Sequence, residues 1–248
     1  MISTIHLAAQ YLATAAISFI TKKDDDSHTN LGWKNHTLET HEFPNGDKLG
    51  LSYESFSLEW IHSNGNKEHF LLNKTTHKDI INWIMQTSKN NGLDMPYQYE
   101  LHYELPYDQV SDGTSFEITN SEDLQVLIQQ RNLAQNVIST ILKSNDFESP
   151  IRIWPHHFDT GAFVNVSDQL SIGLGMAMPD TLIDSFYFYV SGYNGHQPID
   201  IALTNSSHKG SYYSNGWQGF AMSINELDEH SAIEFCQVAI NTYKNTIK

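Results

Sequence analysis

The sequence predicts an α+β protein in which a mostly antiparallel β-sheet packs against helices, including long helices near residues 121–144 and at the C-terminus. Three observations carry this prediction. Hairpin signals cluster in the first third of the chain, short strand-like runs fill the second half, and helical periodicity is confined to separate segments. Hairpins that are segregated from helices favour α+β over alternating βα units.

The N-terminal segment, residues 2–20, predicts a helix. It has no basic start, and His6 and Gln10 interrupt its apolar run, so we expect an amphipathic or buried helix rather than a signal peptide or membrane span. His6 and Gln10 are one helical turn apart and share a face. Their side chains either form hydrogen bonds in the core or help to line a pocket.

The next elements follow from turn and cap signals. Asn45-Gly46 and Asn64-Gly65 each lie between extended runs and predict hairpins. Thr76 opens a helix with a capping pattern, and Gly92 ends it. Residues 97–105, "YQYELHYEL", alternate strictly and predict a half-buried strand.

Residues 121–144 carry the clearest helical periodicity, and the polar stretch "SNDFESP" at its end is the candidate internal boundary. Beyond it come strand-like runs separated by polar or Gly/Pro turns, and then a helix over about 224–246. We expect a single domain over 1–248, with two subdomains as the open alternative: a helix and hairpin part, 1–146, and a β-rich part with the C-terminal helix, 147–248.

Composition excludes several classes of function. The net charge is −15, and no cluster of Lys or Arg stands against it, so we expect neither a nucleic-acid partner nor a membrane partner. Cys236 is the single cysteine, which rules out an internal disulfide and a cysteine-based zinc site. We expect a cytoplasmic protein. The oligomeric state is left open.

No nucleotide cofactor is expected, because the chain has no Walker A loop and only an incomplete dinucleotide-binding pattern. That pattern is "GLGMAM", which starts at Gly173 and lies in a strand-like run rather than at a strand-to-helix turn. Its glycines more simply mark a bulge or a place where another backbone or a ligand approaches closely.

The segment "RIWPHHFD", residues 152–159, holds the richest set of candidate residues. Trp154 ends a strand-like run, and His156, His157 and Asp159 follow Pro155. Imidazole and carboxylate groups can bind a divalent metal or transfer protons as a pair. His157 and Asp159 are the candidate metal ligands, although a metal is not favoured. The competing interpretation is structural, with the rings bonded to nearby carbonyls.

Aromatic residues later in the chain could complete a pocket. Tyr187 and Tyr189 alternate with Phe186 and Phe188, so one strand face presents hydroxyls. Trp217 has glycines on both sides, which suits a ring held against a close backbone. Such a face usually covers the edge of a core, but it also supplies hydrogen bonds to small ligands.

With these residues assembled, the chain resembles a bacterial family of uncharacterised proteins, domain of unknown function 5996. The resemblance rests on "IHLAAQ", "RIWPHHFD", "SDQLSIGLG", "FYFYVSGY" and "GWQGF", which together span nearly the whole chain. It implies no reaction or substrate. It does imply that His156, His157, Phe158, Asp159 and Gln169 belong to the family's pattern.

The sequence leaves three functional hypotheses open. The first is a small-molecule binding protein, in which rings supply the surface and polar groups fix orientation. The second is an enzyme, with His157 as base or metal ligand beside Asp159 and with His6 completing the set. The third is a structural or interaction module with no active site. For the first, the ring surface would come from Trp154, Tyr187, Tyr189 and Trp217, and the polar groups from His157, Asp159 and Gln169.

Overall fold

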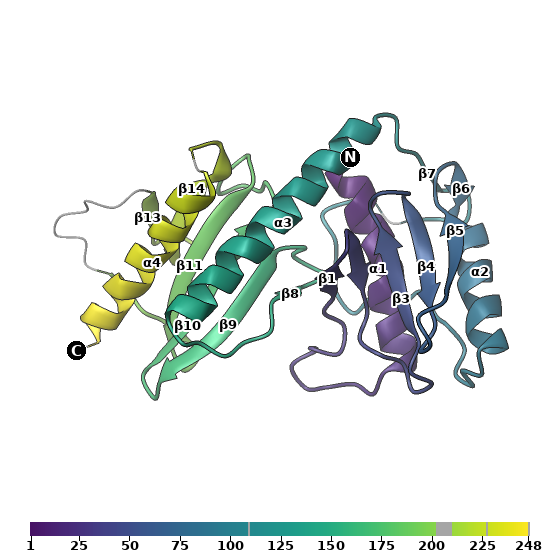
Figure 1. The fold of residues 1–248 in the computed structure, drawn as a ribbon, viewed down its shortest axis with the longest axis horizontal. Coiled ribbons are helices and arrows are strands. Elements are labelled where there is room, and N and C mark those ends of the chain that lie inside the picture. Colours follow the sequence, from purple (N-terminus) through teal and green to yellow (C-terminus); the bar gives the residue numbers. More distant parts are fainter. Residues whose placement is uncertain (109, 202–209, 227, 248) are drawn as a thin grey trace. The chain divides into compact units, whose positions relative to one another are not determined.

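The computed structural model describes residues 1–108, 110–201, 210–226 and 228–247 and confirms the α+β class. The chain forms two compact units. The first unit contains Met1–Gln130 and Ile153–His156, and the second contains Arg131–Arg152 and His157–Lys248. The division falls inside a helix (Figure 1), whereas the expected subdomain boundary lies near residue 146.

The first unit is built on a five-stranded antiparallel sheet in which sequence neighbours pair, in the order β1-β2-β3-β4-β5. Leu38, Leu51, Leu58 and Phe70 are cross-strand neighbours on one face, and the three leucines are fully buried. Because side chains alternate across a strand, this face forms the core. The strands are β1 (Gly32–Lys34), β2 (Thr37–Glu39), β3 (Lys48–Ser52), β4 (Ser57–Ile61) and β5 (Lys67–Leu71).

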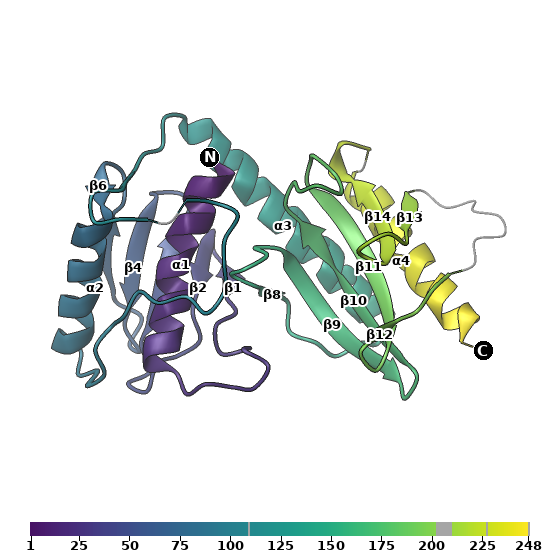
Figure 2. The ribbon, with the colours of Figure 1, turned by 180° about the vertical axis from the view of Figure 1, so that it is seen from behind.

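Two helices pack on this sheet. Helix α1 (Ile2–Phe19) lies in front of the sheet in Figure 2, and α2 (His77–Asn90) stacks Trp83 on Phe70 of the core face. The side chain of Thr76 accepts a hydrogen bond from the backbone amide of Asp79, as the capping pattern predicts. Length and hydropathy would also let α1 cross a membrane, but buried core helices have the same properties, and most of α1 is buried.

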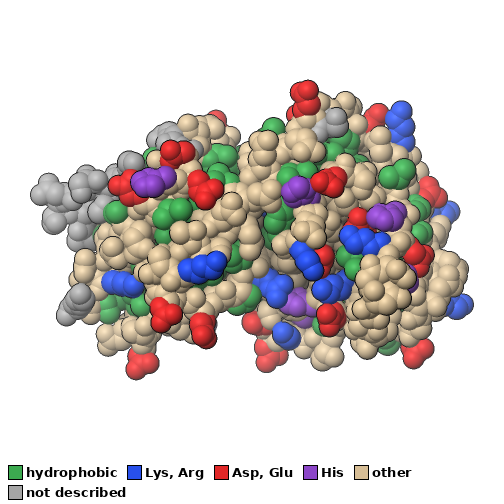
Figure 3. All heavy atoms as spheres, in the orientation of Figure 1, with side chains coloured by type: hydrophobic (Ala, Val, Ile, Leu, Met, Phe, Trp, Pro, Cys, Tyr) green, Lys and Arg blue, Asp and Glu red, His purple; other side chains and the backbone are tan. Residues whose placement is uncertain are grey.

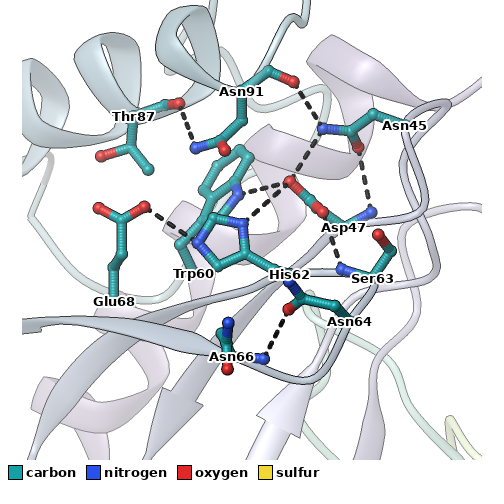
Figure 4. A network of polar contacts seen from close by, with 10 residues as sticks. All are labelled: Asn45, Asp47, Trp60, His62, Ser63, Asn64, Asn66, Glu68, Thr87 and Asn91. Carbon is teal, nitrogen blue, oxygen red and sulfur yellow. Dashed lines mark hydrogen bonds and ion pairs between the residues drawn. The ribbon is translucent and has the colours of Figure 1, made fainter.

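A polar network ties the loops at one end of this sheet together (Figure 4). The buried Asp47 carboxylate accepts hydrogen bonds from the Trp60 indole at 2.8 Å, the Ser63 amide at 2.9 Å and the Asn45 side chain at 2.9 Å. Asn45 also donates to the Asn91 carbonyl, just after α2. Both predicted hairpin turns are therefore fixed to each other and to the end of a helix.

The strand predicted over 97–105 is wrong. The segment has no sheet partner, and its tyrosines contact α1 instead. One side of an extended chain buried against a helix gives the same alternation as one side of a strand buried in a sheet. The contacts run backward along the helix: Tyr97 with Thr14, Tyr99 with Tyr11, Tyr103 with Gln10, and Tyr107 with His6.

The second unit contains a larger sheet with the order β13-β14-β11-β10-β9-β8, and β12 pairs with β11. The long strand β10 pairs antiparallel with β9 on one side and with β11 on the other. The strands are β8 (Arg152–Ile153), β9 (Thr160–Ser167), β10 (Leu170–Ala177), β11 (Tyr187–Asn194), β12 (Gln197–Pro198), β13 (Ser211–Tyr213) and β14 (Gly219–Ser223). The remaining short pair, β6 (Thr75–Thr76) with β7 (Ser115–Phe116), belongs to the first unit.

Two helices cover one face of the second sheet, as Figures 1 and 2 show from opposite sides. They are the later part of α3 (Ser121–Ser144) and α4 (Glu229–Thr246). Tyr243 of α4 packs so closely on β11 that a Cβ added to Gly192 would lie 2.3 Å from its ring. Asn145, just after α3, bonds to Gln237 of α4 at 2.7 Å, so the two helices are also joined to each other.

The predicted long helices are confirmed, with one change at a boundary. Helix α3 spans the predicted 121–144, and the Asn120 side chain caps it by accepting from the Glu122 amide. The C-terminal helix begins later than predicted. A 3₁₀ turn, η1 (Ile224–Glu226), comes first, and α4 then starts at Glu229, where Asp228 accepts a hydrogen bond from the Ser231 amide.

Candidate functional site

The segment "RIWPHHFD" is divided between the two units, and the candidate residues divide with it. The first unit holds His6, Gln10, Trp154 and His156, and the second holds His157, Asp159, Gln169, Tyr187, Tyr189 and Trp217.

In the first unit, His6 and Gln10 hold one backbone carbonyl. The His6 Nε2 lies 2.6 Å from the Pro155 oxygen, and the Gln10 side-chain nitrogen lies 3.0 Å from the same atom. Because a carbonyl only accepts, His6 donates from Nε2, and in the neutral ring Nδ1 accepts from the Tyr107 hydroxyl at 3.2 Å. The Gln10 oxygen accepts from Tyr103. These bonds support the core interpretation of both residues.

His156 and Trp154 lie in an aromatic cluster of the same unit. The His156 ring is 5.5 Å from the Tyr103 ring and 6.0 Å from the Trp154 ring, centre to centre. Both residues are half-buried. Tyr103 contacts both Gln10 and His156, so it joins the aromatic cluster to helix α1.

The centre of the second cluster is Asp159, which lies just before β9. Its Oδ2 accepts a hydrogen bond from the Tyr189 hydroxyl. The residue as a whole is half-buried, but its Oδ1 is fully enclosed and has no hydrogen-bond partner among the described residues. Burial raises the pKa of the Asp159 carboxyl, and the Tyr189 bond and the charges of His157 and Arg131 offset only part of that rise.

Arg131 of α3 was not among the predicted site residues. Its guanidinium donates to the Thr160 hydroxyl at 2.6 Å and to the Phe158 carbonyl at 2.8 Å, and it lies 4.4 Å from the centre of the Phe158 ring. Phe158 has a φ of 58°, an unfavourable conformation for a bulky residue. Arg131 thus holds the strained turn that carries Asp159. The sequence did contain a signal for Arg131, because it is a basic residue in the apolar stripe that contains Leu127 and Ala134.

Two glycines make room for the Tyr189 side chain. Gly175 pairs with Gly161 on one side and with Tyr189 on the other. A Cβ added to Gly175 would lie 2.6 Å from the Tyr189 hydroxyl, and one added to Gly161 would lie 2.9 Å from it. The phenol therefore crosses two strands to reach Asp159. The close approach predicted at "GLGMAM" is made by the Tyr189 side chain, rather than by another backbone or a ligand.

Tyr187 and Trp217 flank this pair. The Tyr187 hydroxyl donates to Asp180 at 2.7 Å, and its pKa is raised by burial, by that bond and by the charges of Asp180 and Asp159. The Trp217 ring meets the Tyr189 ring nearly at a right angle, with the centres 6.1 Å apart. Asp180 was also not predicted, because a lone aspartate in a turn carries no distinctive sequence signal.

Gln169 lies away from this cluster, contrary to the expected grouping with Asp159. It is exposed in the turn between β9 and β10, whereas Asp159 precedes the other end of β9. A strand rises about 3.3 Å per residue, so the length of β9 puts roughly 25 Å between them.

A hollow of about 460 Å³ lies near that turn, between the end of the β9–β10 hairpin and the end of α4. Its lining contains none of the predicted site residues, so it does not identify the Asp159 cluster as a pocket. The lining residues are Val166, Ser167, Leu170, Asn241, Lys244, Asn245 and Ile247.

The described residues offer little for metal binding or thiol chemistry. No group of three or more His, Cys, Asp or Glu side chains that could hold a metal occurs in the described part of the chain. His157 and Asp159 remain a candidate pair, without a third donor of these types in that part. Cys236 is buried, which raises the pKa of its thiol to about 12 and keeps it protonated at neutral pH.

No family model matches the chain, and no curated protein or solved structure is significantly similar to it. The resemblance to domain of unknown function 5996 therefore stays a prediction. What the clusters can do follows from their geometry and chemistry.

Proposed function

We propose that the second unit binds a small molecule around Asp159 and Tyr189, on the face of its sheet that its helices leave uncovered. The observation that carries the proposal is the buried Asp159 Oδ1, which has no hydrogen-bond partner in the described part of the chain. The Tyr189 bond occupies only the other oxygen.

The position of these groups on the sheet supports the proposal. Gly192 of β11 packs against α4, so Val190 and Phe188, at alternate positions, share that helix-covered face. Tyr187 and Tyr189 therefore point to the opposite face. We call this the open face, because α3 and α4 do not cover it, and define it by Gly161, Gly173, Gly175, Tyr187, Tyr189, Ser191 and Tyr193. Tyr189 and Tyr193 are partly exposed, and the other five residues are buried.

Exposure along β9 is consistent with this division of the sheet. Phe163 lies beside the open face, since a Cβ added to Gly173 would lie 3.7 Å from its ring, and Phe163 is 55% exposed. Its neighbours Ala162 and Val164 point the other way and are buried. An exposed ring on a sheet face is available to an apolar part of a ligand.

A purely structural role for Asp159 is unfavourable in free energy. A buried polar atom without a partner costs about 1–3 kcal/mol, and more if the group is charged. An uncharged side chain could accept the Tyr189 bond without the additional cost of a buried charge. Groups that lower stability in this way are common where a protein binds or reacts with another molecule.

The test is Asp159→Asn, which keeps the size of the side chain and removes its charge. The pKa of Asp159 is higher in the folded than in the unfolded protein. At a pH above the folded pKa the ionised carboxylate therefore lowers stability, and at a pH below the unfolded pKa the group is protonated in both states and this loss disappears. We therefore expect the variant to be more stable than the wild type at neutral pH. The difference should shrink as the pH falls toward about 4, as urea unfolding across pH will measure.

The same variant tests binding. In a thermal-shift screen of metabolites, compounds that raise the melting temperature of the wild type should fail to do so with Asp159→Asn. Asp168→Asn is the matched control, because Asp168 is exposed in the distant β9–β10 turn. Loss of stability in Asp159→Asn, with every thermal shift retained, would show that Asp159 is structural.

A catalytic role is the second candidate, because the charge of His157 acts on the Asp159 carboxyl. A carboxyl whose pKa is raised by burial can exchange protons nearer neutral pH than an ordinary one. The metal-dependent version predicts stoichiometric metal in the purified protein and a lower melting temperature after chelation. Purified protein without metal and with unchanged melting in chelator would refute that version.

A further inference from the structure

The charges around Asp159 limit the kind of ligand that the open face can take. Strands β9, β10, β11, β13 and β14 contain no Asp, Glu, Lys or Arg. Two carboxylates bond to the tyrosines of the open face: Asp159, just before β9, and Asp180, in the β10–β11 loop. Tyr187 and Tyr189 share this face of β11, so the two carboxylates that they contact lie on the same side of the sheet.

The basic groups that act on Asp159 are Arg131 and His157. Arg131, on α3, is 5% exposed. Its guanidinium already donates to the Thr160 hydroxyl and the Phe158 carbonyl and lies over the Phe158 ring. His157 is exposed. Arg152 lies on the edge strand β8. An anionic ligand at Asp159 would thus meet carboxylates, with no Lys or Arg on the three strands that form the open face.

Aromatic rings supply the rest of the surface. The Trp217 and Tyr189 rings meet nearly at a right angle, and the Tyr189 hydroxyl is bonded to Asp159. Ring faces beside a carboxylate attract organic ammonium groups through cation–π and charge interactions. We infer that the ligand of the open face carries an ammonium group, held between the Asp159 carboxylate and the rings of Tyr189 and Trp217. This inference rests on the proposed binding function.

Trp217 offers a fluorescence signal for a ligand beside Tyr189, because the two rings are in contact. Asp159 Oδ1 is enclosed, so a ligand contacts it only after a neighbouring side chain moves. Trp217 lies in the short turn between β13 and β14, and its ring packs on Gly219, where an added Cβ would lie 2.4 Å from it. A ligand that contacts the indole would change the fluorescence of Trp217.

The experiment compares choline with its uncharged carbon isostere, 3,3-dimethylbutan-1-ol, by calorimetry and tryptophan fluorescence on the full chain. We expect saturable choline binding that weakens as salt is added, and roughly tenfold weaker binding of the isostere. Asp159→Asn should weaken choline binding about tenfold, and Asp168→Asn should not change it. Trp217→Phe should remove the fluorescence change and leave a calorimetric signal.

The outcomes separate this inference from the proposed function. If the isostere binds as tightly as choline, or if only uncharged or anionic compounds give shifts that depend on Asp159, the ammonium inference is wrong and small-molecule binding stands. If no compound of any charge gives a shift that depends on Asp159, both are wrong. Choline binding that is unchanged in Asp159→Asn also overturns the inference.

Discussion

Asp47 and Asp159 are both aspartates beside a sheet, and their surroundings differ at the level of single atoms. Asp47, in the first unit, accepts hydrogen bonds from Trp60, Ser63 and Asn45, which satisfy both carboxylate oxygens. Asp159, in the second unit, has one bond on one oxygen. A carboxylate with several donors stabilises the fold, whereas one with an unsatisfied buried oxygen reduces its stability.

Asp47→Asn should therefore behave in the opposite way to Asp159→Asn. The amide nitrogen that replaces one oxygen would face donors instead of accepting from them, so at least one buried hydrogen bond is lost. We expect the free energy of unfolding to fall by about 2 kcal/mol in urea titrations. Asp94→Asn, an exposed aspartate of the same unit, is the control and should change stability little. Equal stability of both variants would contradict the role of the network in Figure 4.

At the same scale, the sequence indicated the right residue types but not their partners. His6 and Gln10 could be recognised as polar residues on one helix face, yet their shared acceptor, Pro155, lies 149 and 145 residues further along the chain. Asp159 and Tyr189 were both candidates, but nothing local links residues of different strands. Arg131 was missed because its contacts are formed only after α3 packs on the turn at Phe158.

At the scale of elements, helices were predictable because caps and periodicity are local. The extended segment over 97–105 was not, because alternation reports a face that is buried and does not report what buries it. Tyr97 and Tyr103 turn toward Thr14 and Gln10 of α1 rather than toward a sheet. This segment differs from a strand because its backbone pairs with no sheet. The residue pattern does not record whether the backbone is paired.

Tyr103→Phe tests whether hydrogen bonds from this segment stabilise the first unit. The variant keeps the ring but leaves the Gln10 oxygen without the donor that lies 2.6 Å away. We expect a loss of about 1 kcal/mol and faster amide exchange in α1. Tyr99→Phe is the matched control, because the Tyr99 and Tyr11 rings pack with their centres 5.1 Å apart and Phe keeps that ring contact. Similar losses in the two variants would mean that the Gln10 bond has no special part in holding the segment.

At the scale of the whole molecule, the excess of acidic groups is the dominant electrostatic feature. The net charge is −15, and Figure 3 shows Lys and Arg side chains interspersed with Asp and Glu on the face in view. Pairs such as Lys67 with Glu59 at 2.6 Å and Lys48 with Glu39 at 3.4 Å neutralise part of this charge locally. Such partly exposed pairs contribute about 0–1 kcal/mol each, so net repulsion should prevail.

Added salt should therefore raise the melting temperature at neutral pH. Between about 0.02 and 0.3 M sodium chloride the screening length falls from about 20 Å to about 6 Å, which removes most long-range repulsion between carboxylates. Scanning calorimetry over this range measures the effect, with sucrose as an uncharged comparison. A melting temperature that falls with salt would mean that the local ion pairs outweigh the net charge.

Helix α3 and the segment Ile153–His156 constrain any attempt to study the halves in isolation. A gene truncated after residue 130 would end in the middle of α3 and would lack Pro155, whose carbonyl accepts from His6 and Gln10. A gene starting at residue 131 would place a free amino terminus on Arg131, whose side chain donates a hydrogen bond to the Phe158 carbonyl. Dissection by cloning would damage each half at the residues of greatest interest, so isotope labelling of the intact polypeptide is the better route to their separate behaviour.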